Sequence, residues 1–278
     1  MFKNIVISII CLLVFAPECF AQYTRAEKTL KIQLVRNATM KITYAGRTFL
    51  TDPMLSAKGV MDPFAGIARN PTIDLPMKTD EVLSSVECVL VTHGHPDHFD
   101  TAAIGIIPKE TPIFCQAGDE EILKKSGFTS VTPVETSRGW NNITIIRTGG
   151  KHGSGKILEH MGKVSGFILT AKGEPTVYWI GDSVWCVEVK EAIDKYRPDI
   201  IIAHSGGAKI PGFEPILMDA AQTTGLAKYA PKASIVAIHM EALDHCTVTR
   251  QNLSFETDKA GISASRLVIP KDGETVSF

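Results

Sequence analysis

Alternating hydrophobic and polar residues dominate the first part of the chain. Residues 30–35 and 40–44 alternate with a period of two, and Ala45-Gly46 turns the chain into a third such segment at 47–52. This period is typical of strands with one buried face. Similar patterns predict strands at 86–91, 112–115, 130–134, 142–147, 164–170, 176–180, 199–203, 234–238 and 266–269, and helices from 101 and at 119–125, 187–196, 218–229 and 249–260.

The order of these elements indicates the fold class. Strands come first in meanders and later alternate with helices, which fits two sheets packed face to face with helices outside them. The Pro-rich segment 53–79 is expected to be a long irregular loop. No linker, repeat or low-complexity tract divides the chain, so residues 22–278 are predicted to form one α/β (α+β) domain with a large core.

The N-terminal segment has the features of a targeting sequence. Lys3 supplies a positive charge, residues 5–16 are apolar, and Cys19 and Ala21 place small side chains before a cleavage point. The apolar stretch is short for a membrane span. We therefore predict that residues 1–21 are a secretory signal peptide and that the mature protein is exported, periplasmic or extracellular, without a stable membrane span. An uncleaved membrane anchor is the alternative.

The charge balance argues against two kinds of partner. The net charge is −1, and cleavage after residue 21 leaves it unchanged because it removes one Lys and one Glu. Nothing in this balance favours nucleic acid or an anionic membrane surface. Cys88 and Cys115 lie in strand-like segments, where buried free thiols are usual. Disulfide pairing and oligomeric state are not predicted by the sequence.

One hexapeptide carries the strongest chemical signal. His93-Gly94-His95-Pro96-Asp97-His98 directly follows the apolar run 86–92, and it contains three of the eight His of the chain. A strand that ends in this cluster places three imidazoles and a carboxylate at one edge of a sheet. Imidazole suits zinc, iron and nickel, and a carboxylate adds an oxygen ligand. The pattern predicts a metal site.

This hexapeptide resembles the His-x-His-x-Asp-His signature of the metallo-β-lactamase fold superfamily. The resemblance implies a four-layer αββα sandwich and three further ligands at strand ends, a His, an Asp and a His. The sequence offers His152, Asp182 and His239 in that order. The segments Leu50-Thr51-Asp52-Pro53 and Ile180-Gly181-Asp182-Ser183 are similar to the branch that includes ascorbate-phosphate lactonase-like and phospholipase D-like hydrolases.

The resemblance also implies a division of the ligands between two divalent metal ions. His93, His95 and His152 would hold the first metal, Asp97, His98 and His239 the second, and Asp182 would bridge them. Zinc is the expected metal, with manganese and iron as alternatives. Two such ions lower the pKa of a shared water from ~16 towards ~7, which makes a nucleophile at neutral pH. Asp97 is predicted to orient this nucleophile and so to act in catalysis.

Three further residues have candidate roles at this site. His204 ends the strand 199–203 and is predicted to contact substrate or to donate a proton to a leaving group, with a surface or supporting position as the alternative. Asp52 is expected either to accept the second ring proton of a motif His or to form an Asp-Pro turn. His245 is the alternative to His239 as the last ligand.

These residues predict an exported hydrolase with two metals, which cleaves an ester, lactone or phosphodiester bond in a small or lipid-like substrate. A mono-iron oxygenase of the sulfur-dioxygenase type, built on His93, His152 and Asp182, is one alternative. A β-lactam hydrolase is disfavoured because those relatives usually lack the carboxylate that Asp182 supplies. A binding protein without catalysis is the remaining possibility. The loops 53–79 and 206–215 are predicted to form the pocket rim.

Overall fold

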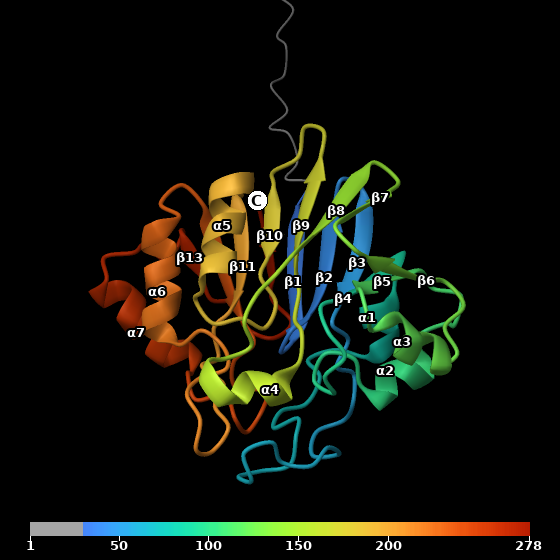
Figure 1. Cartoon of the computed structure of the whole chain (residues 1–278), viewed down its shortest axis with the longest axis horizontal. Helices are drawn as coiled ribbons and strands as arrows, with labels where there is room; N and C mark the ends of the chain where they lie inside the picture. Colours follow the sequence, from blue (N-terminus) through green and yellow to red (C-terminus); the bar gives the residue numbers. More distant parts are fainter. Residues whose placement is uncertain (1–29) are drawn as a thin grey trace, which may run out of the picture.

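Two mixed sheets packed face to face form the centre of the protein. The computed structural model describes residues 30–278, and the predicted signal peptide lies outside this range. Figure 1 shows the two sheets in the middle, with helices on both outer sides. This is the αββα sandwich predicted from the sequence.

The first sheet begins as a meander and continues with parallel strands. Its order is β14-β1-β2-β3-β4-β5-β6, antiparallel from β14 to β3 and parallel from β3 to β6. The strands are β1 Lys31–Arg36, β2 Thr39–Tyr44, β3 Arg47–Thr51, β4 Cys88–Val91, β5 Ile113–Gln116, β6 Val131–Val134 and β14 Thr275–Ser277.

The second sheet repeats this plan. Its order is β13-β12-β11-β10-β9-β8-β7, antiparallel from β7 to β10 and parallel from β10 to β13. The strands are β7 Ser137–Trp140, β8 Ile143–Thr148, β9 Gly166–Ala171, β10 Val177–Trp179, β11 Ile200–His204, β12 Ser234–Ile238 and β13 Leu267–Val268.

The helices cover the outer face of each sheet. Those against the first sheet are α1 Thr79–Leu83, α2 Thr101–Ile106 and α3 Glu120–Lys125. Those against the second sheet are α5 Val187–Tyr196, α6 Ala220–Tyr229 and α7 Arg250–Lys259. A 3-10 turn at Gly155–Ile157 and the short helix α4 Leu158–Met161 lie in the loop after β8.

Strand β4 shows how the sequence builds these layers. Cys88 and Leu90 pack into the core between the sheets, whereas Val89 and Val91 pack against the helices. Because successive side chains of a strand point to opposite faces, a strand buried on both faces must be apolar at every position. Full burial of each Val or Leu side chain contributes about 1.5–3 kcal/mol. Cys88 and Cys115 are buried free thiols, as predicted.

Five short elements were not predicted. They are α1, α4, β7, β14 and the 3-10 turn at Gly155–Ile157. The strand β7 is mostly exposed, so its sequence shows no alternation of apolar residues. Asn141, with a positive φ of 52°, is the kind of residue that closes a tight hairpin between β7 and β8. The strand β14 pairs with β1 across almost the whole length of the chain. No helix within residues 30–278 is long and apolar enough to cross a membrane.

Candidate metal centre

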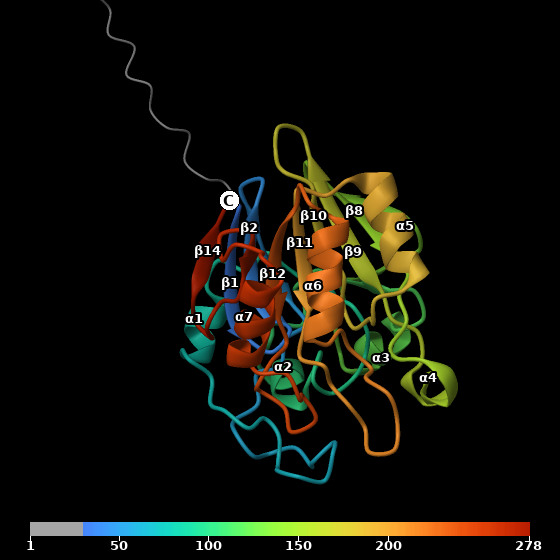
Figure 2. The same ribbon diagram turned by 90° about the vertical axis from the view of Figure 1, so that its left-hand side faces the viewer.

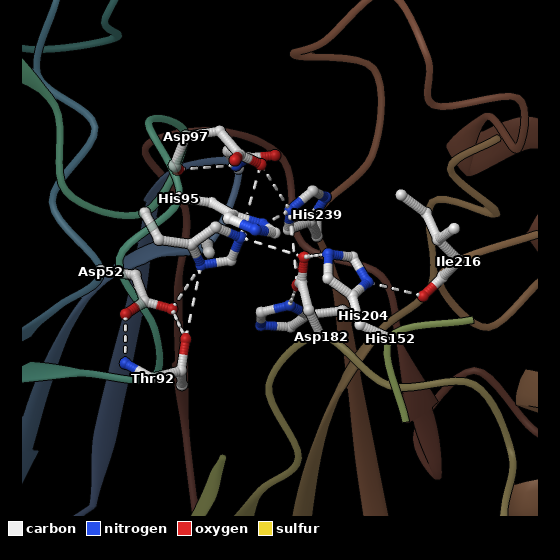
Figure 3. Close-up of polar contacts among 12 residues, drawn as sticks. Asp52, Thr92, His95, Asp97, His152, Asp182, His204, Ile216 and His239 are labelled. Atoms are coloured by element: carbon white, nitrogen blue, oxygen red, sulfur yellow. Dashed lines mark hydrogen bonds and ion pairs between the residues drawn. The ribbon is translucent and has the colours of Figure 1, made fainter. Parts of the chain in front are cut away.

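Six strands end at the same edge of the sandwich and carry the predicted ligands to it. The strands β3 and β4 are parallel, and β8 runs in the direction of β10 because both are antiparallel to β9. The residues that follow or end these strands are Asp52 after β3, residues 93–98 after β4, His152 after β8, Asp182 after β10, His204 at the end of β11 and His239 after β12. Figure 3 shows their side chains converging between the two sheets.

The first group of ligands consists of His93, His95 and His152. Their ring nitrogens lie within 4.8 Å of one another, and His93 Nε2 is 2.9 Å from His95 Nδ1. Nitrogens bound to one zinc at 2.0–2.1 Å in a tetrahedral arrangement are roughly 3.3 Å apart. The spacing of this group therefore fits a metal ion.

The second group consists of Asp97, His98, Asp182 and His239. Asp97 Oδ2 is 3.4 Å from His98 Nε2 and 3.3 Å from His239 Nε2, and the two Nε2 atoms are 3.3 Å apart. These distances also match the edges of a metal coordination shell. His239 joins this group, whereas His245, the alternative ligand, does not.

Asp182 lies between the two groups. Its Oδ2 is 3.1 Å from His98 Nε2 in the second group and 3.3 Å from His152 Nε2 in the first. One oxygen therefore faces both sets of ligands, which is the position predicted for a bridging carboxylate. Gly181 makes the turn into this position with a φ of +72°, and a Cβ there would lie 2.4 Å from Ser165 O. Only glycine fits at this turn.

The outer ring nitrogens of the ligands are also engaged. His98 Nδ1 lies 2.6 Å from Asp52 Oδ2, and His152 Nδ1 lies 2.9 Å from the Ile216 carbonyl oxygen. Donation from each Nδ1 leaves the Nε2 lone pair pointing into the cluster, where a metal requires it. Of the two roles considered for Asp52, the structure places it in contact with a motif His.

Thr92 orients Asp52 and was not identified from the sequence. Its N–H donates to Asp52 Oδ1 at 2.8 Å, and its hydroxyl donates to Oδ2 at 2.6 Å. The same hydroxyl lies 3.1 Å from His93 Nδ1. Its position directly before the His motif is the signal that could have identified it. A carboxylate with three donors is held in one orientation, and it can therefore hold the His98 ring in turn.

His204 lies behind Asp182 and is fully buried. Its Nδ1 is 2.5 Å from Asp182 Oδ1, and the Trp179 indole N–H donates to its Nε2 at 2.9 Å. Because indole is only a donor, Nε2 is the acceptor and Nδ1 carries the proton donated to Asp182. We predicted that His204 contacts substrate or donates a proton to it. The structure directs both ring nitrogens to protein atoms, which favours a role in holding Asp182.

A Trp179→Phe variant tests this arrangement. It removes the donor that fixes the His204 tautomer, so we expect metal affinity or activity to fall by ~10–100-fold while the fold is retained. Trp140→Phe is the matched control, because Trp140 packs on Phe49 in the same core without touching the cluster. Equal effects of the two substitutions on metal content and kcat/KM would contradict the role of Trp179.

The electrostatics of the cluster also call for cations. Burial alone would lower the pKa of His98. The carboxylates of Asp182, Asp97 and Asp52 outweigh burial and raise this pKa well above its usual value. The three buried carboxylates carry three negative charges, and two divalent ions would carry four positive charges. Buried charges of one sign are costly unless they are compensated. The donor set therefore fits two divalent metals balanced by one further anion.

An apolar pocket of about 330 Å³ opens beside the cluster. His95, Asp97, His152 and Asp182 line its floor, and its walls are formed by Pro63, Phe64, Met161, Ile210, Ile216 and other neighbours. The loops 53–79 and 206–215 both contribute to it, as predicted for the rim. Both loops extend from the same end of the molecule in two perpendicular views (Figures 1 and 2). No Lys or Arg is among the residues that line this pocket.

Asp244 anchors the loop that carries Phe64. Its carboxylate accepts hydrogen bonds from the backbone N–H groups of Phe64, Ala65 and Ile67 at 2.9–3.1 Å, and from Asn70 Nδ2 at 2.9 Å. Nothing in the sequence pattern indicates this contact, because Asp244 is typical of an ordinary polar turn residue. The anchor fixes one wall of the pocket to the segment that follows His239.

The comparisons with known proteins agree with this geometry. Residues 47–240 match the family model described as the beta-lactamase superfamily domain. The chain belongs to this superfamily. The protein YddR of Bacillus subtilis is 34% identical to this member of the superfamily over 90% of the chain and 100% of YddR.

Two solved structures are also similar to this member of the β-lactamase superfamily. A possible metal-dependent hydrolase from Veillonella parvula is 36% identical with a TM-score of 0.87, covering 90% of this chain and 100% of that chain. An isothiocyanate hydrolase from Delia radicum gut bacteria is 34% identical with a TM-score of 0.85, covering 89% and 99%. The predicted superfamily, fold and metal-dependent hydrolase class are thereby confirmed.

Proposed function

We propose that this protein is a dinuclear metal hydrolase that cleaves an ester or lactone bond in a small, largely apolar substrate. The observation that carries the proposal is the sharing of Asp182 between two ligand groups beside an apolar pocket. His93, His95 and His152 would hold one metal, and Asp97, His98 and His239 the other. When bound, the two metals supply an activated water at neutral pH and polarise the bond that is cleaved.

The residues of the chain contribute positioning and exclusion of water. Asp97 lines the pocket and its Oδ2 lies near both His98 and His239, so it would orient the attacking water. Phe64, Ile210 and Ile216 would pack against the apolar part of the substrate. His204 would hold the Asp182 carboxylate through its Oδ1.

The lining of the pocket favours a neutral substrate. A phosphodiester, the third substrate class predicted from the sequence, carries a negative charge that bound metals would meet at the reacting group but that no Arg or Lys in the lining would meet. The pocket walls offer Phe64, Met161, Ile210 and Ile216 instead. An uncharged ester or lactone with an apolar group therefore fits this pocket better than a phosphodiester does.

Isothiocyanates are the second candidate substrate. The similarity to an isothiocyanate hydrolase covers 89% of this chain, and a neutral R–N=C=S group needs no cationic cradle. Addition of water would form a C–O bond at the central carbon and place a proton on nitrogen. Transfer of the second proton of the water to nitrogen with cleavage of the C–N bond would then release the amine and carbonyl sulfide. A small aryl or alkyl group would occupy the apolar part of the pocket.

Metal content and turnover test these proposals together. The protein would be purified without chelator, its metals counted by elemental mass spectrometry, and its activity measured on an aryl ester, a lactone, a phosphodiester and a phenylalkyl isothiocyanate. We expect about two equivalents of zinc, or of manganese or iron, because His98 and His239 complete the second group. One equivalent of iron with oxygen consumption would instead support the mono-iron oxygenase. Two equivalents without turnover would overturn the proposed substrates.

Export is a further part of this proposal. The positive residue Lys3 and the apolar stretch 5–16 support a cleaved signal peptide. Expression of the full chain in a Gram-negative host should yield a periplasmic protein whose intact mass matches a chain that begins at Gln22. A cytoplasmic product that retains Met1 would contradict export.

A further inference from the structure

His245 is a buried histidine with unused ring nitrogens. The residue is only 6% exposed, and its Nδ1 has no hydrogen-bond partner within residues 30–278. Nε2 also has no protein partner in this range, but it is not among the fully buried atoms. Most buried polar groups are hydrogen-bonded, and leaving one unpaired destabilises the folded protein. An unpaired ring at this depth therefore indicates a partner other than the protein.

The ring of His245 borders the pocket beside the metal centre. The other polar side chains of this pocket, those of His95, Asp97, His152 and Asp182, all belong to the proposed ligand groups. His245 is thus the polar side chain in the lining that no metal would occupy. It lies outside both groups even though it follows His239 closely in the sequence.

The position of the ring is fixed by its neighbours. Phe64 meets it edge-on, with ring centroids 5.2 Å apart at 90°. The backbone on either side is held, because Lys209 N donates to the His245 carbonyl oxygen and Asp244 is bound to the loop that carries Phe64. Burial lowers the pKa of His245, so the neutral ring offers one donor and one acceptor at pH 7. A substrate atom in the pocket would meet a preoriented group.

We propose that His245 is a substrate-contacting residue, which hydrogen-bonds through a ring nitrogen to the polar atom of the bound substrate. This inference rests on the proposed function, because it concerns the same pocket. It narrows the substrate class to small apolar molecules with one heteroatom next to the scissile bond, such as a carbonyl oxygen of an ester or the nitrogen of an isothiocyanate. The apolar remainder would lie against Phe64 and the Ile216 side chain.

Two substitutions test the contact. His245→Phe keeps a planar ring and removes both nitrogens, and we expect kcat/KM to fall ~100–1,000-fold, the effect of losing one preorganised hydrogen bond at a reacting group. His245→Gln places an amide near Nε2 and should retain more activity than the Phe variant. His160→Phe is the matched control, because His160 is exposed in α4 and outside the pocket lining.

Metal content and thermal stability separate this role from a structural one. If His245 serves the substrate, His245→Phe should keep about two metals and melt at or above the wild-type Tm, because it removes an unpaired buried group. Lost metal, a lowered Tm or wild-type kcat/KM in this variant would overturn the inference. A wild-type protein that binds two metals but turns over none of the substrates would instead count against the proposed function.

Discussion

Replacing Asp182 with Asn should weaken metal binding in both ligand groups and abolish most of the turnover. Asn keeps the shape of the side chain but removes the charge that faces His98 and His152. It also changes the partner of His204, whose Nδ1 proton needs an acceptor at Oδ1. Residues that only support a metal ligand typically contribute up to ~100-fold. Because Asp182 would itself be a ligand, we expect kcat/KM to fall by more than this.

The Asp182→Asn variant is best judged on its metal content. Elemental mass spectrometry should find clearly less than one equivalent of metal for each of the two ligand groups, and therefore a total clearly below that of the wild-type protein. Asp194→Asn is a matched control on the exposed side of α5, where the carboxylate accepts a hydrogen bond from the Tyr229 hydroxyl. Full metal occupancy in Asp182→Asn would show that this carboxylate does not bridge.

The second large effect is expected from His98→Ala. His98 Nε2 contacts Asp97 and Asp182, and His239 lies 3.3 Å away, so its loss opens only the second group. The first group, with His93 and His152, is left intact. We therefore expect about one metal equivalent to be lost, together with a fall in kcat of ~100-fold or more.

This variant should also be less stable before metal is added. Asp52 is fully buried and would lose its partner 2.6 Å away, and breaking one side of a buried charge pair typically costs about 3–5 kcal/mol. A double variant, His98→Ala with Asp52→Asn, should recover part of the lost stability without recovering metal. Unchanged metal stoichiometry in His98→Ala would contradict the assignment of two ligand groups.

The convergence of the candidate ligands could be predicted because most of their signal is local. His93, His95, Asp97 and His98 lie within six consecutive positions after an apolar strand, and His239 directly follows another strand. Parallel strands bring their carboxyl ends to one edge, so strand-end residues from distant parts of the chain converge without further information. The resemblance to a known superfamily supplied the order of the downstream ligands.

The contacts of His204 and Asp244 could not be predicted in the same way. His204 reads as a strand-end residue facing substrate, and only the Trp179 indole on the neighbouring strand reveals that it faces inward. Asp244 is bound to a loop some 180 positions earlier in the chain. Such contacts depend on how two sheets and their loops are juxtaposed, and neither periodicity nor spacing carries that information.

Because Asp244 holds the loop by its backbone, the side chains that this loop contributes to the pocket wall can change. Its carboxylate accepts hydrogen bonds from the backbone N–H groups of Phe64, Ala65 and Ile67, and these bonds do not involve their side chains. Phe64 can therefore be exchanged for a smaller or more polar residue while the loop keeps its path over the metal centre. A duplicated copy of this gene could acquire a new substrate through such exchanges at one loop, with the ligands and their supporting residues inherited unaltered.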